Sequence, residues 1–195
     1  FDGIFSTPRG VSGCDFYPAL EAELLRRGYS REAAFMDERG EPRFRVGQVY
    51  RRLWSEPVRR FAEISELPLP LRAALDEAFE LPGLALLAEQ ASQDGTRKFL
   101  FRLADDQAIE TVAIPDGDRL TFCISSQAGC ALQCAFCATG VMGFARNLGI
   151  HEVAGQVREL ALLDPPLRAT NIVFMGMGEP LMNWDAVAGT LTILN

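Results

Sequence analysis

The stretch Cys130-Ala131-Leu132-Gln133-Cys134-Ala135-Phe136-Cys137 holds three of the five cysteines of this 195-residue chain. Cysteines this close together do not form a disulfide framework, and thiolates are ligands that suit zinc and iron–sulfur clusters. A structural zinc site is closed by four ligands, but only three cysteines are local here. Three thiolates on a four-iron cluster leave one iron open to a cofactor. The spacing therefore predicts an iron–sulfur cluster; a zinc site completed from other sequence, or three buried cysteines, are the alternatives.

A glycine-rich motif, Gly176-Met177-Gly178-Glu179-Pro180, follows the short apolar segment Asn171–Met175. Glycines at a strand end let the backbone approach a ligand closely, and ligands of α/β proteins bind at the carboxyl ends of strands. Glu179 can accept a hydrogen bond from an ammonium group there. An ordinary strand-to-helix turn is the alternative.

The hydrophobic pattern around these motifs alternates between strand and helix. Residues Leu120–Ser125 and Asn171–Met175 read as strands, and His151–Leu163 and Asp185–Leu194 as helices. Alternation of this kind predicts an α/β fold with a parallel sheet and outer helices. Just before it, Lys98–Leu103 and Ile109–Ile114 are apolar runs joined by a turn, which predicts a β-hairpin.

Helical spacing dominates the first 90 residues instead. We expect helices at Pro18–Arg27, Arg31–Arg39, Phe44–Trp54, Pro57–Ile64 and Leu69–Phe79. The chain is therefore divided into residues 1–30 without a firm assignment, a helical accessory domain at 31–92, a β-hairpin connector at 93–118 and a catalytic α/β part at 119–195.

Charge and composition set further limits. The formal net charge is −7 with a pI near 4.8, which alone argues weakly against a nucleic-acid partner. However, seven arginines and two glutamates lie between Arg39 and Arg60. Such a local basic face can bind phosphates, although charge alone favours the alternative of a solvated helical face. No apolar run reaches the roughly 18 residues of a membrane-spanning helix. The clustered cysteines and the lack of a signal peptide predict a reducing cytoplasm.

The spacing C-x3-C-x-aromatic-C resembles the signature of the radical S-adenosylmethionine (SAM) superfamily. The resemblance implies that Cys130, Cys134 and Cys137 hold a [4Fe–4S] cluster whose open iron chelates SAM. It also implies that Phe136 lies beside the SAM adenine, with an ordinary core phenylalanine as the alternative. Gly178 and Glu179 resemble the Gly-Glu-Pro element that contacts the SAM amino group.

Four longer segments narrow this resemblance, namely Phe122–Cys130, Ala138–Gly140, Gly143–Leu148 and Phe174–Asn183. Together they closely resemble the RNA-adenine carbon-2 methyltransferases, over roughly Arg39 to Asn195. That family methylates an adenosine of 23S ribosomal RNA and, in many bacteria, an adenosine beside the tRNA anticodon. The resemblance implies that residues 119–195 are the first part of a partial (β/α)6 barrel, and that the chain is an N-terminal fragment.

The family's chemistry assigns two further residues. Carbon 2 of adenine is not nucleophilic, so the methyl group is carried on a cysteine and activated by a radical derived from SAM. A base then removes the carbon-2 proton, and a second cysteine releases the product with formation of a disulfide. The resemblance implies Glu110 as the base and Cys123 as the second cysteine; a surface glutamate and a buried strand cysteine are the alternatives. Since no cysteine follows Cys137, the methyl-carrying cysteine is missing and we expect the isolated chain to be inactive.

The resemblance also implies partners. Arg43, Arg45, Arg51 and Arg52 would contact RNA phosphates, and an electron donor such as flavodoxin or ferredoxin would reduce the cluster of a monomeric enzyme. Two alternatives to the carbon-2 activity stay open: an adenine carbon-8 ribosomal RNA methyltransferase, and a zinc-stabilised RNA-binding module without catalysis.

Overall fold

The computed structural model describes residues 31–42, 44–81 and 83–194. The chain divides into two compact units, one up to Pro82 and one that begins at Gly83. The expected helix Pro18–Arg27 lies outside the described residues. No helix in the described part of the chain is long and apolar enough to cross a membrane.

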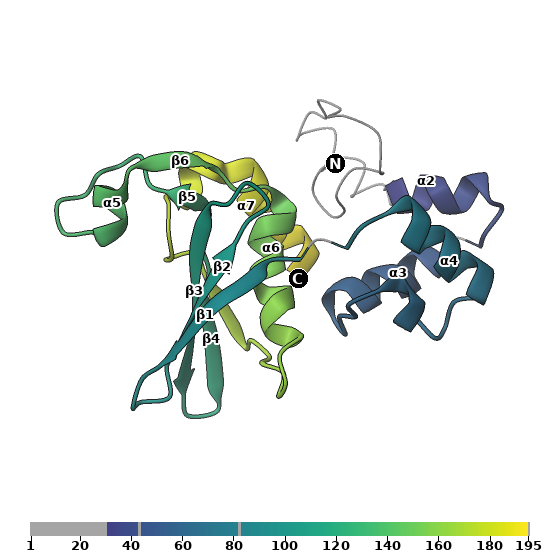
Figure 1. Cartoon of the computed structure of the whole chain (residues 1–195), viewed down its shortest axis with the longest axis horizontal. Coiled ribbons are helices and arrows are strands. Elements are labelled where there is room, and N and C mark those ends of the chain that lie inside the picture. Colours follow the sequence, from purple (N-terminus) through teal and green to yellow (C-terminus); the bar gives the residue numbers. More distant parts are fainter. Residues whose placement is uncertain (1–30, 43, 82, 195) are drawn as a thin grey trace. The chain divides into compact units, whose positions relative to one another are not determined.

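The first unit consists of short helices (Figure 1). Apolar side chains of these helices form a small core. Its elements are α2 (Arg31–Glu38), α3 (Phe44–Trp54), the 3-10 turn η1 (Phe61–Glu63) and α4 (Leu69–Ala78). Helix α3 buries one side, which includes Val49, Leu53 and Trp54. Its arginines lie on the other sides, as the helical period of its apolar residues predicts. A proline in the first turn of α4 suits the fixed backbone angle of that position. The core side chains include Met36, Val49, Leu53, Phe61, Ile64, Leu71 and Leu75.

The predicted helix Pro57–Ile64 is wrong, because only the turn Phe61–Glu63 is helical. The residue before it, Arg60, is extended, with φ −144° and ψ 151°. One carbonyl group of η1 and two of the residues that follow it accept hydrogen bonds from a side chain instead. The guanidinium of Arg72 donates to the carbonyl oxygens of Leu67 (2.7 Å), Ser65 (2.6 Å) and Ala62 (3.3 Å). The backbone carbonyl groups of this non-helical stretch are thus satisfied from α4.

The second unit is built on a five-stranded sheet in the order β1-β2-β3-β4-β7. The strands are β1 (Ala85–Ala91), β2 (Arg97–Arg102), β3 (Ala108–Asp116), β4 (Arg119–Cys123) and β7 (Asn171–Val173). The predicted hairpin is confirmed as the antiparallel β2–β3 pair. The predicted parallel pairing is confirmed for β4 and β7. The other neighbouring strands, from β1 to β4, pair antiparallel, so the sheet as a whole is mostly antiparallel. Strand β1 also corrects the helical assignment of residues up to 92, since residues 85–91 extend the sheet.

One face of this sheet forms the core of the second unit. Phe99 and Phe101 of β2, Ile109 of β3 and Phe122 of β4 are almost completely buried on it. Helix α6 (Ile150–Ala161) lies alongside the sheet (Figure 1), and the side chains of Thr111 on β3 and Gln156 on α6 form a hydrogen bond of 2.7 Å. The other face carries partly exposed residues, including Leu100 and Val112.

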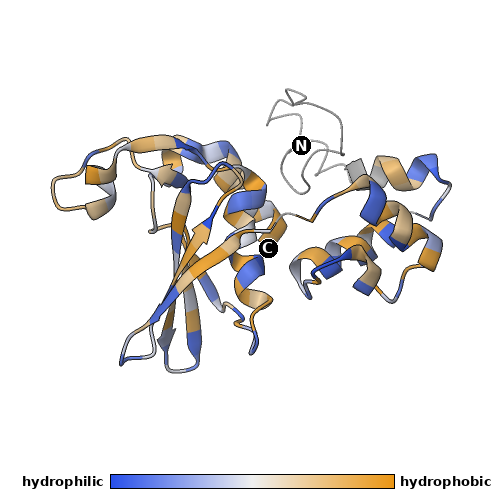
Figure 2. Cartoon of the chain, in the orientation of Figure 1, coloured by the Kyte–Doolittle hydropathy of each residue, from blue (hydrophilic) through white to orange (hydrophobic). Residues whose placement is uncertain are grey.

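Smaller elements surround the end of β4. Two short strands, β5 (Gln127–Gly129) and β6 (Phe144–Asn147), form an antiparallel ladder. Between them lie the cysteines and α5 (Ala138–Met142), whose segment is coloured mainly hydrophobic in Figure 2. The 3-10 turn η2 (Pro180–Asn183) and α7 (Trp184–Leu194) follow β7.

Candidate cofactor and active site

The cysteine loop, residues 130–143, is closed at its base by the β5–β6 ladder. Ala128 pairs with Arg146 across this ladder, and the backbone nitrogen of Cys130 donates to the carbonyl oxygen of Gly143 (2.9 Å). Gly129 has φ +77°, and a Cβ atom there would overlap the Gly143 carbonyl oxygen. The two ends of the loop therefore meet at a point that only glycine permits.

The three cysteines of the loop are free thiols, of which Cys130 is buried and Cys134 and Cys137 are partly exposed. The Cys137 nitrogen donates to the carbonyl oxygen of Cys134 (3.0 Å), which folds the two residues into a turn. Hydrogen bonds from the backbone nitrogens of Gly140 and Thr139 hold the pKa of the Cys137 thiol below its usual range. This environment favours the thiolate, the form that binds metal.

The donor set of this loop fits an iron–sulfur cluster by its chemistry, since three free thiols lie within eight residues. The geometry is less complete: among the described residues, no group of three or more His, Cys, Asp or Glu side chains is arranged to hold a metal ion. Phe136 is 94% exposed, so its interpretation as an ordinary core phenylalanine is wrong.

The glycine-rich motif packs directly on the segment that leads into the cysteine loop. The Ser126 nitrogen donates to the Met177 carbonyl oxygen (2.8 Å), and the Gly176 nitrogen donates to that of Ile124 (3.1 Å). A Cβ at Gly176 would lie 2.8 Å from the Ile124 carbonyl, and one at Gly178 (φ +96°) would lie 2.5 Å from the Cβ of Gln127. Both glycines therefore serve close backbone packing.

Glu179 is attached to the same segment. Its backbone nitrogen donates to the side-chain oxygen of Gln127 (2.9 Å), and its carboxylate accepts from the Leu181 nitrogen (3.2 Å), which caps η2. The carboxylate is half-buried and keeps further acceptor capacity, because an ionised carboxylate has about four lone-pair sites. The two predicted motifs are thus parts of one connected structure.

Glu110 and Cys123 share the partly exposed face of the sheet. Cys123 pairs with Val112 on β3, and Glu110 lies two residues from Val112 on the same face. The Glu110 carboxylate forms an ion pair of 2.9 Å with Lys98 of β2. Burial raises the pKa of the Cys123 thiol, although a hydrogen bond from the backbone of Met175 opposes this.

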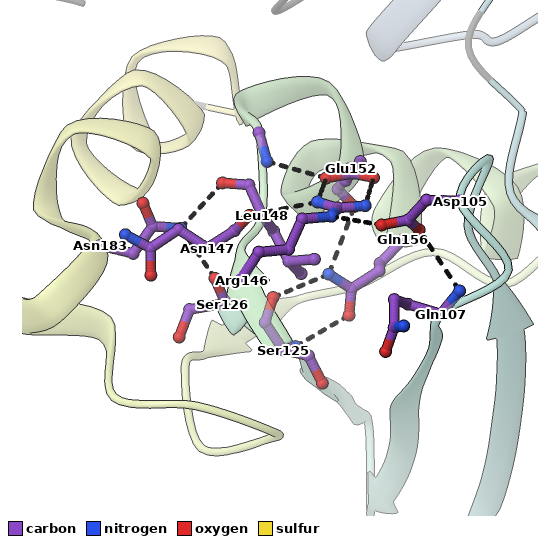
Figure 3. Close-up of polar contacts among 11 residues, drawn as sticks. Asp105, Gln107, Ser125, Ser126, Arg146, Asn147, Leu148, Glu152, Gln156 and Asn183 are labelled. Carbon is purple, nitrogen blue, oxygen red and sulfur yellow. Dashed lines mark hydrogen bonds and ion pairs between the residues drawn. The ribbon is translucent and has the colours of Figure 1, made fainter. Parts of the chain in front are cut away.

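Arg146 is the centre of a polar network that sequence patterns did not reveal (Figure 3). Its guanidinium binds both carboxylate oxygens of Glu152 (2.7 and 2.8 Å) and one of Asp105 (2.6 Å). Glu152 is buried and also accepts from the Gly149 nitrogen (2.9 Å). These contacts raise the pKa of Arg146 and lower that of Asp105. They connect β6, the start of α6 and the β2–β3 turn.

Comparisons with known proteins show which proteins this chain resembles. No family model matches the chain. A relative from Gemmatimonas aurantiaca, named "Probable dual-specificity RNA methyltransferase RlmN", is 66% identical over 93% of the chain and 48% of its own length. The dual-specificity RNA methyltransferases RlmN of Geotalea uraniireducens and Halorhodospira halophila are 45% and 48% identical over 83% and 85% of the chain, and each is matched over 46% of its length. A crystal structure of a radical SAM methyltransferase from Sphaerobacter thermophilus matches with a TM-score of 0.72 and 38% identity, over 92% of this chain and 50% of that one.

The chain belongs to the RlmN family of RNA methyltransferases. It spans about half the length of the curated relatives it matches. The closed base of the cysteine loop and the packed Gly-Glu-Pro segment are therefore features of an RlmN-family fold.

The arginines that we expected to contact RNA are engaged within the first unit. Arg45 donates to Gln48 (3.0 Å) and to the carbonyl oxygen of Glu66 (2.8 Å). Arg51 pairs with Glu66 (2.9 Å) and Arg52 with Glu56 (3.0 Å). Arg43 lies outside the described residues. The local excess of arginine that the sequence suggested is thus partly neutralised by ion pairs.

Three residues in contact with the candidate site residues or with the segments around them have no clear local signature in the sequence: Lys98, Arg146 and Gln156. Gln156 is fully buried and joins α6 to β3 and to both backbone groups of Ser125. Only weak signals were present, such as a glutamine on the apolar side of a helix and a glutamate three residues after Gly149. Their partners lie far away in the sequence, where no local pattern points to them.

Proposed function

We propose that this chain is the part of an RlmN-type enzyme that binds a [4Fe–4S] cluster and SAM and presents an adenosine for methylation at carbon 2. The substrates are 23S ribosomal RNA and tRNA. One observation carries the proposal: the cysteine loop and the Gly-Glu-Pro loop are both attached to residues 124–127, so two separate cofactor motifs share one rigid base. The family membership of the chain supports the same activity.

The cofactor roles follow from the donor chemistry of the two loops. Cys130, Cys134 and Cys137 would hold the cluster, with Phe136, Gly178 and Glu179 around SAM. When bound, the cluster and SAM supply the radical that activates the methyl group. The lowered pKa of Cys137 favours ligation, and the half-buried Glu179 carboxylate can accept from an ammonium group. The exposed Phe136 ring is free to stack on an adenine.

The residues that would act on the substrate lie on the partly exposed face of the sheet. Glu110, held by Lys98, accepts the carbon-2 proton of the adenine. Cys123, whose thiol pKa is raised by burial, loses its proton and attacks the sulfur of the methyl-carrying cysteine. The disulfide forms as the bond between that sulfur and the carbon attached to adenine breaks, and this carbon takes up a proton to become the methyl group of the product. The methyl-carrying cysteine would be supplied by further sequence of a longer protein. The same sequence would complete the partial (β/α)6 barrel, of which β4 and β7 form the first parallel pair.

The first unit would bind RNA, and a flavodoxin or ferredoxin would reduce the cluster of this monomeric, cytoplasmic enzyme. Residues 31–92, 93–118 and 119–195 correspond in this proposal to the accessory domain, the connector and the catalytic part, with β1 extending the connector.

Anaerobic reconstitution of the chain with iron and sulfide tests the cofactor proposal. We expect about four irons and four sulfides per chain, a broad visible absorbance, and a change in the electron paramagnetic resonance (EPR) spectrum of the reduced cluster when SAM is added. Cys134→Ala should lose the cluster, whereas the matched Cys123→Ala should keep it. One tightly bound zinc in place of iron would favour the RNA-binding module instead.

A methylation assay tests the reaction. A longer protein that contains this sequence and the methyl-carrying cysteine should give 2-methyladenosine, detected by mass spectrometry of digested RNA. Product methylated at carbon 8 would contradict the carbon-2 assignment. Robust turnover by the 195-residue chain alone would show that no further cysteine is needed.

A further inference from the structure

We propose that Arg102 binds a phosphate group of the RNA substrate beside the sheet face that carries Glu110 and Cys123. This inference rests on the proposed function and adds a contact point in the second unit. None of the four arginines that the sequence indicated for RNA lies there.

Most cations of the second unit already have an interaction partner. Arg97 pairs with Glu89 (2.7 Å), Lys98 with Glu110 (2.9 Å), and Arg158 with Glu159 (2.9 Å). Arg146 binds two carboxylates, and Arg168 has an interaction of its own. Within residues 83–194, Arg102 and Arg119 are left as exposed cations without an ion pair or hydrogen bond from the side chain. A cation whose charge is not neutralised internally is available to a polyanion.

Arg102 lies on the same face of the sheet as Glu110, the proposed proton acceptor, and close to it in the β2–β3 ladder. Leu100 pairs directly with Glu110 across the β2–β3 ladder. Lys98 and Arg102 flank Leu100 at two residues on either side, so both point to the face of Glu110, while Phe99 and Phe101 are buried on the other face. Diagonal neighbours in such a ladder are roughly 7–8 Å apart. The distance between Arg102 and Glu110 is therefore comparable to the length of one nucleotide.

Among the described residues, no acid near Arg102 forms an ion pair with it. Lys98 holds Glu110, and Arg146 holds Asp105 in the adjoining turn. Asp106 in the same turn is exposed and forms no ion pair with Arg102. The planar guanidinium can thus donate two parallel hydrogen bonds to a phosphate, the geometry for which arginine is suited.

Arg119 provides a matched control. It is exposed, lacks an ion pair with any described residue and, by strand alternation, lies on the face of Cys123. However, it begins β4 whereas Cys123 ends it, so the two residues are separated by roughly 13 Å along the strand. The two arginines share chemistry and exposure and differ in their distance from the proposed site.

The test is RNA binding by the 195-residue chain, measured by fluorescence anisotropy with a labelled RNA stem-loop whose loop contains adenosine. Titrations at several KCl concentrations give the slope of log Kd against log salt. Arg102→Ala should weaken binding about fivefold at low salt and flatten the slope by about 0.7–0.9, the value for one lost phosphate contact. Arg119→Ala should leave the slope unchanged, and Arg102→Lys should keep most of it.

The outcomes separate this inference from the function on which it rests. If the wild-type chain binds RNA and Arg102→Ala keeps the wild-type slope, the inference is wrong and the proposed function stands. Equal losses in Arg102→Ala and Arg119→Ala would also overturn it, since they would indicate general charge attraction. If the wild-type chain does not bind the stem-loop, both the inference and RNA recognition by this chain are refuted. Circular dichroism of each variant confirms folding.

Discussion

The side-chain oxygen of Gln127 accepts a hydrogen bond from the backbone nitrogen of Glu179 (2.9 Å), although the two residues are 52 positions apart. The amide nitrogen of Gln127 donates in turn to Asn147 (2.7 Å). One buried side chain thus connects the Gly-Glu-Pro loop to both strands at the base of the cysteine loop. The two motifs are held in a fixed relation before any cofactor binds, which reduces the ordering cost of binding.

Gly178→Ala tests how closely the Gly-Glu-Pro loop packs against Gln127. Gly178 has φ +96°, and its Cβ would lie 2.5 Å from the Cβ of Gln127. We expect the free energy of unfolding to fall by about 2–4 kcal/mol, from backbone strain and overlap together. The control is Gly117→Ala, where φ is +57° but nothing lies within 4 Å; about 1 kcal/mol is expected there. Urea denaturation measures both, and equal losses would contradict the packing argument.

Gln156 tests the attachment of α6 to the sheet. Its side chain accepts from Thr111 (2.7 Å) and the Ser125 nitrogen (2.8 Å), and donates to the Ser125 carbonyl oxygen (2.8 Å). Gln156→Leu leaves these buried groups without partners and should lower the free energy of unfolding by about 3 kcal/mol. Gln107→Leu, in the exposed β2–β3 turn, should stay within about 0.5 kcal/mol. A loss below 1 kcal/mol in Gln156→Leu would refute the role.

The sequence predicted local features well and long-range ones poorly. The bounds of α3 and the β2–β3 hairpin follow from period and turn residues within a few positions. Strand β1 was missed because every one of its residues is exposed and its composition, rich in alanine and leucine, is typical of a helix. The irregular segment around η1 was missed because carbonyl groups of the residues after η1 accept hydrogen bonds from the side chain of Arg72 on α4, and no apolar period signals such side-chain contacts.

The same limit applies to the site. The cysteines and the Gly-Glu-Pro residues are recognisable because they lie within short motifs. Lys98 could not be connected with Glu110 from the sequence, since the contact depends on the register of two strands. The basic face of the first unit was overestimated, because Glu66, a partner of its arginines, follows the arginine-rich stretch.

Arg146 is expected to be a stability determinant with a measurable pH signature. Arg146→Met removes two hydrogen bonds from the buried carboxylate of Glu152 and should cost about 3 kcal/mol at pH 7. Asp105→Asn removes only the more exposed partner and should cost less than about 1 kcal/mol. Chemical denaturation at pH 7 measures both, and Arg60→Met, whose pair with Glu63 is exposed at 3.7 Å, should be neutral.

The pH dependence has a defined sign. Hydrogen bonds from Arg146 lower the pKa of folded Asp105, so its contribution is complete above its unfolded pKa of about 4 and is lost as the pH falls toward the folded value. The difference in unfolding free energy between wild type and Asp105→Asn should therefore shrink as the pH falls below about 4. A difference that grows on acidification would exclude the ion pair as its source.

Arg51 and Arg52 of the first unit form ion pairs with Glu66 and Glu56, so their contribution to RNA binding can be tested by changing either the arginines or an acidic partner. Replacing Arg51 and Arg52 together by alanine should weaken RNA binding several-fold and reduce its salt dependence. Glu66→Gln should do the opposite, since it removes the charge that holds Arg51 at 2.9 Å and releases a side chain that is already 52% exposed. Binding about two- to threefold tighter in Glu66→Gln is the expected size for one surface ion pair worth less than 1 kcal/mol. If the double alanine variant binds as wild type does and Glu66→Gln changes nothing, the ion pairs serve only the fold of the first unit, and RNA must be held elsewhere.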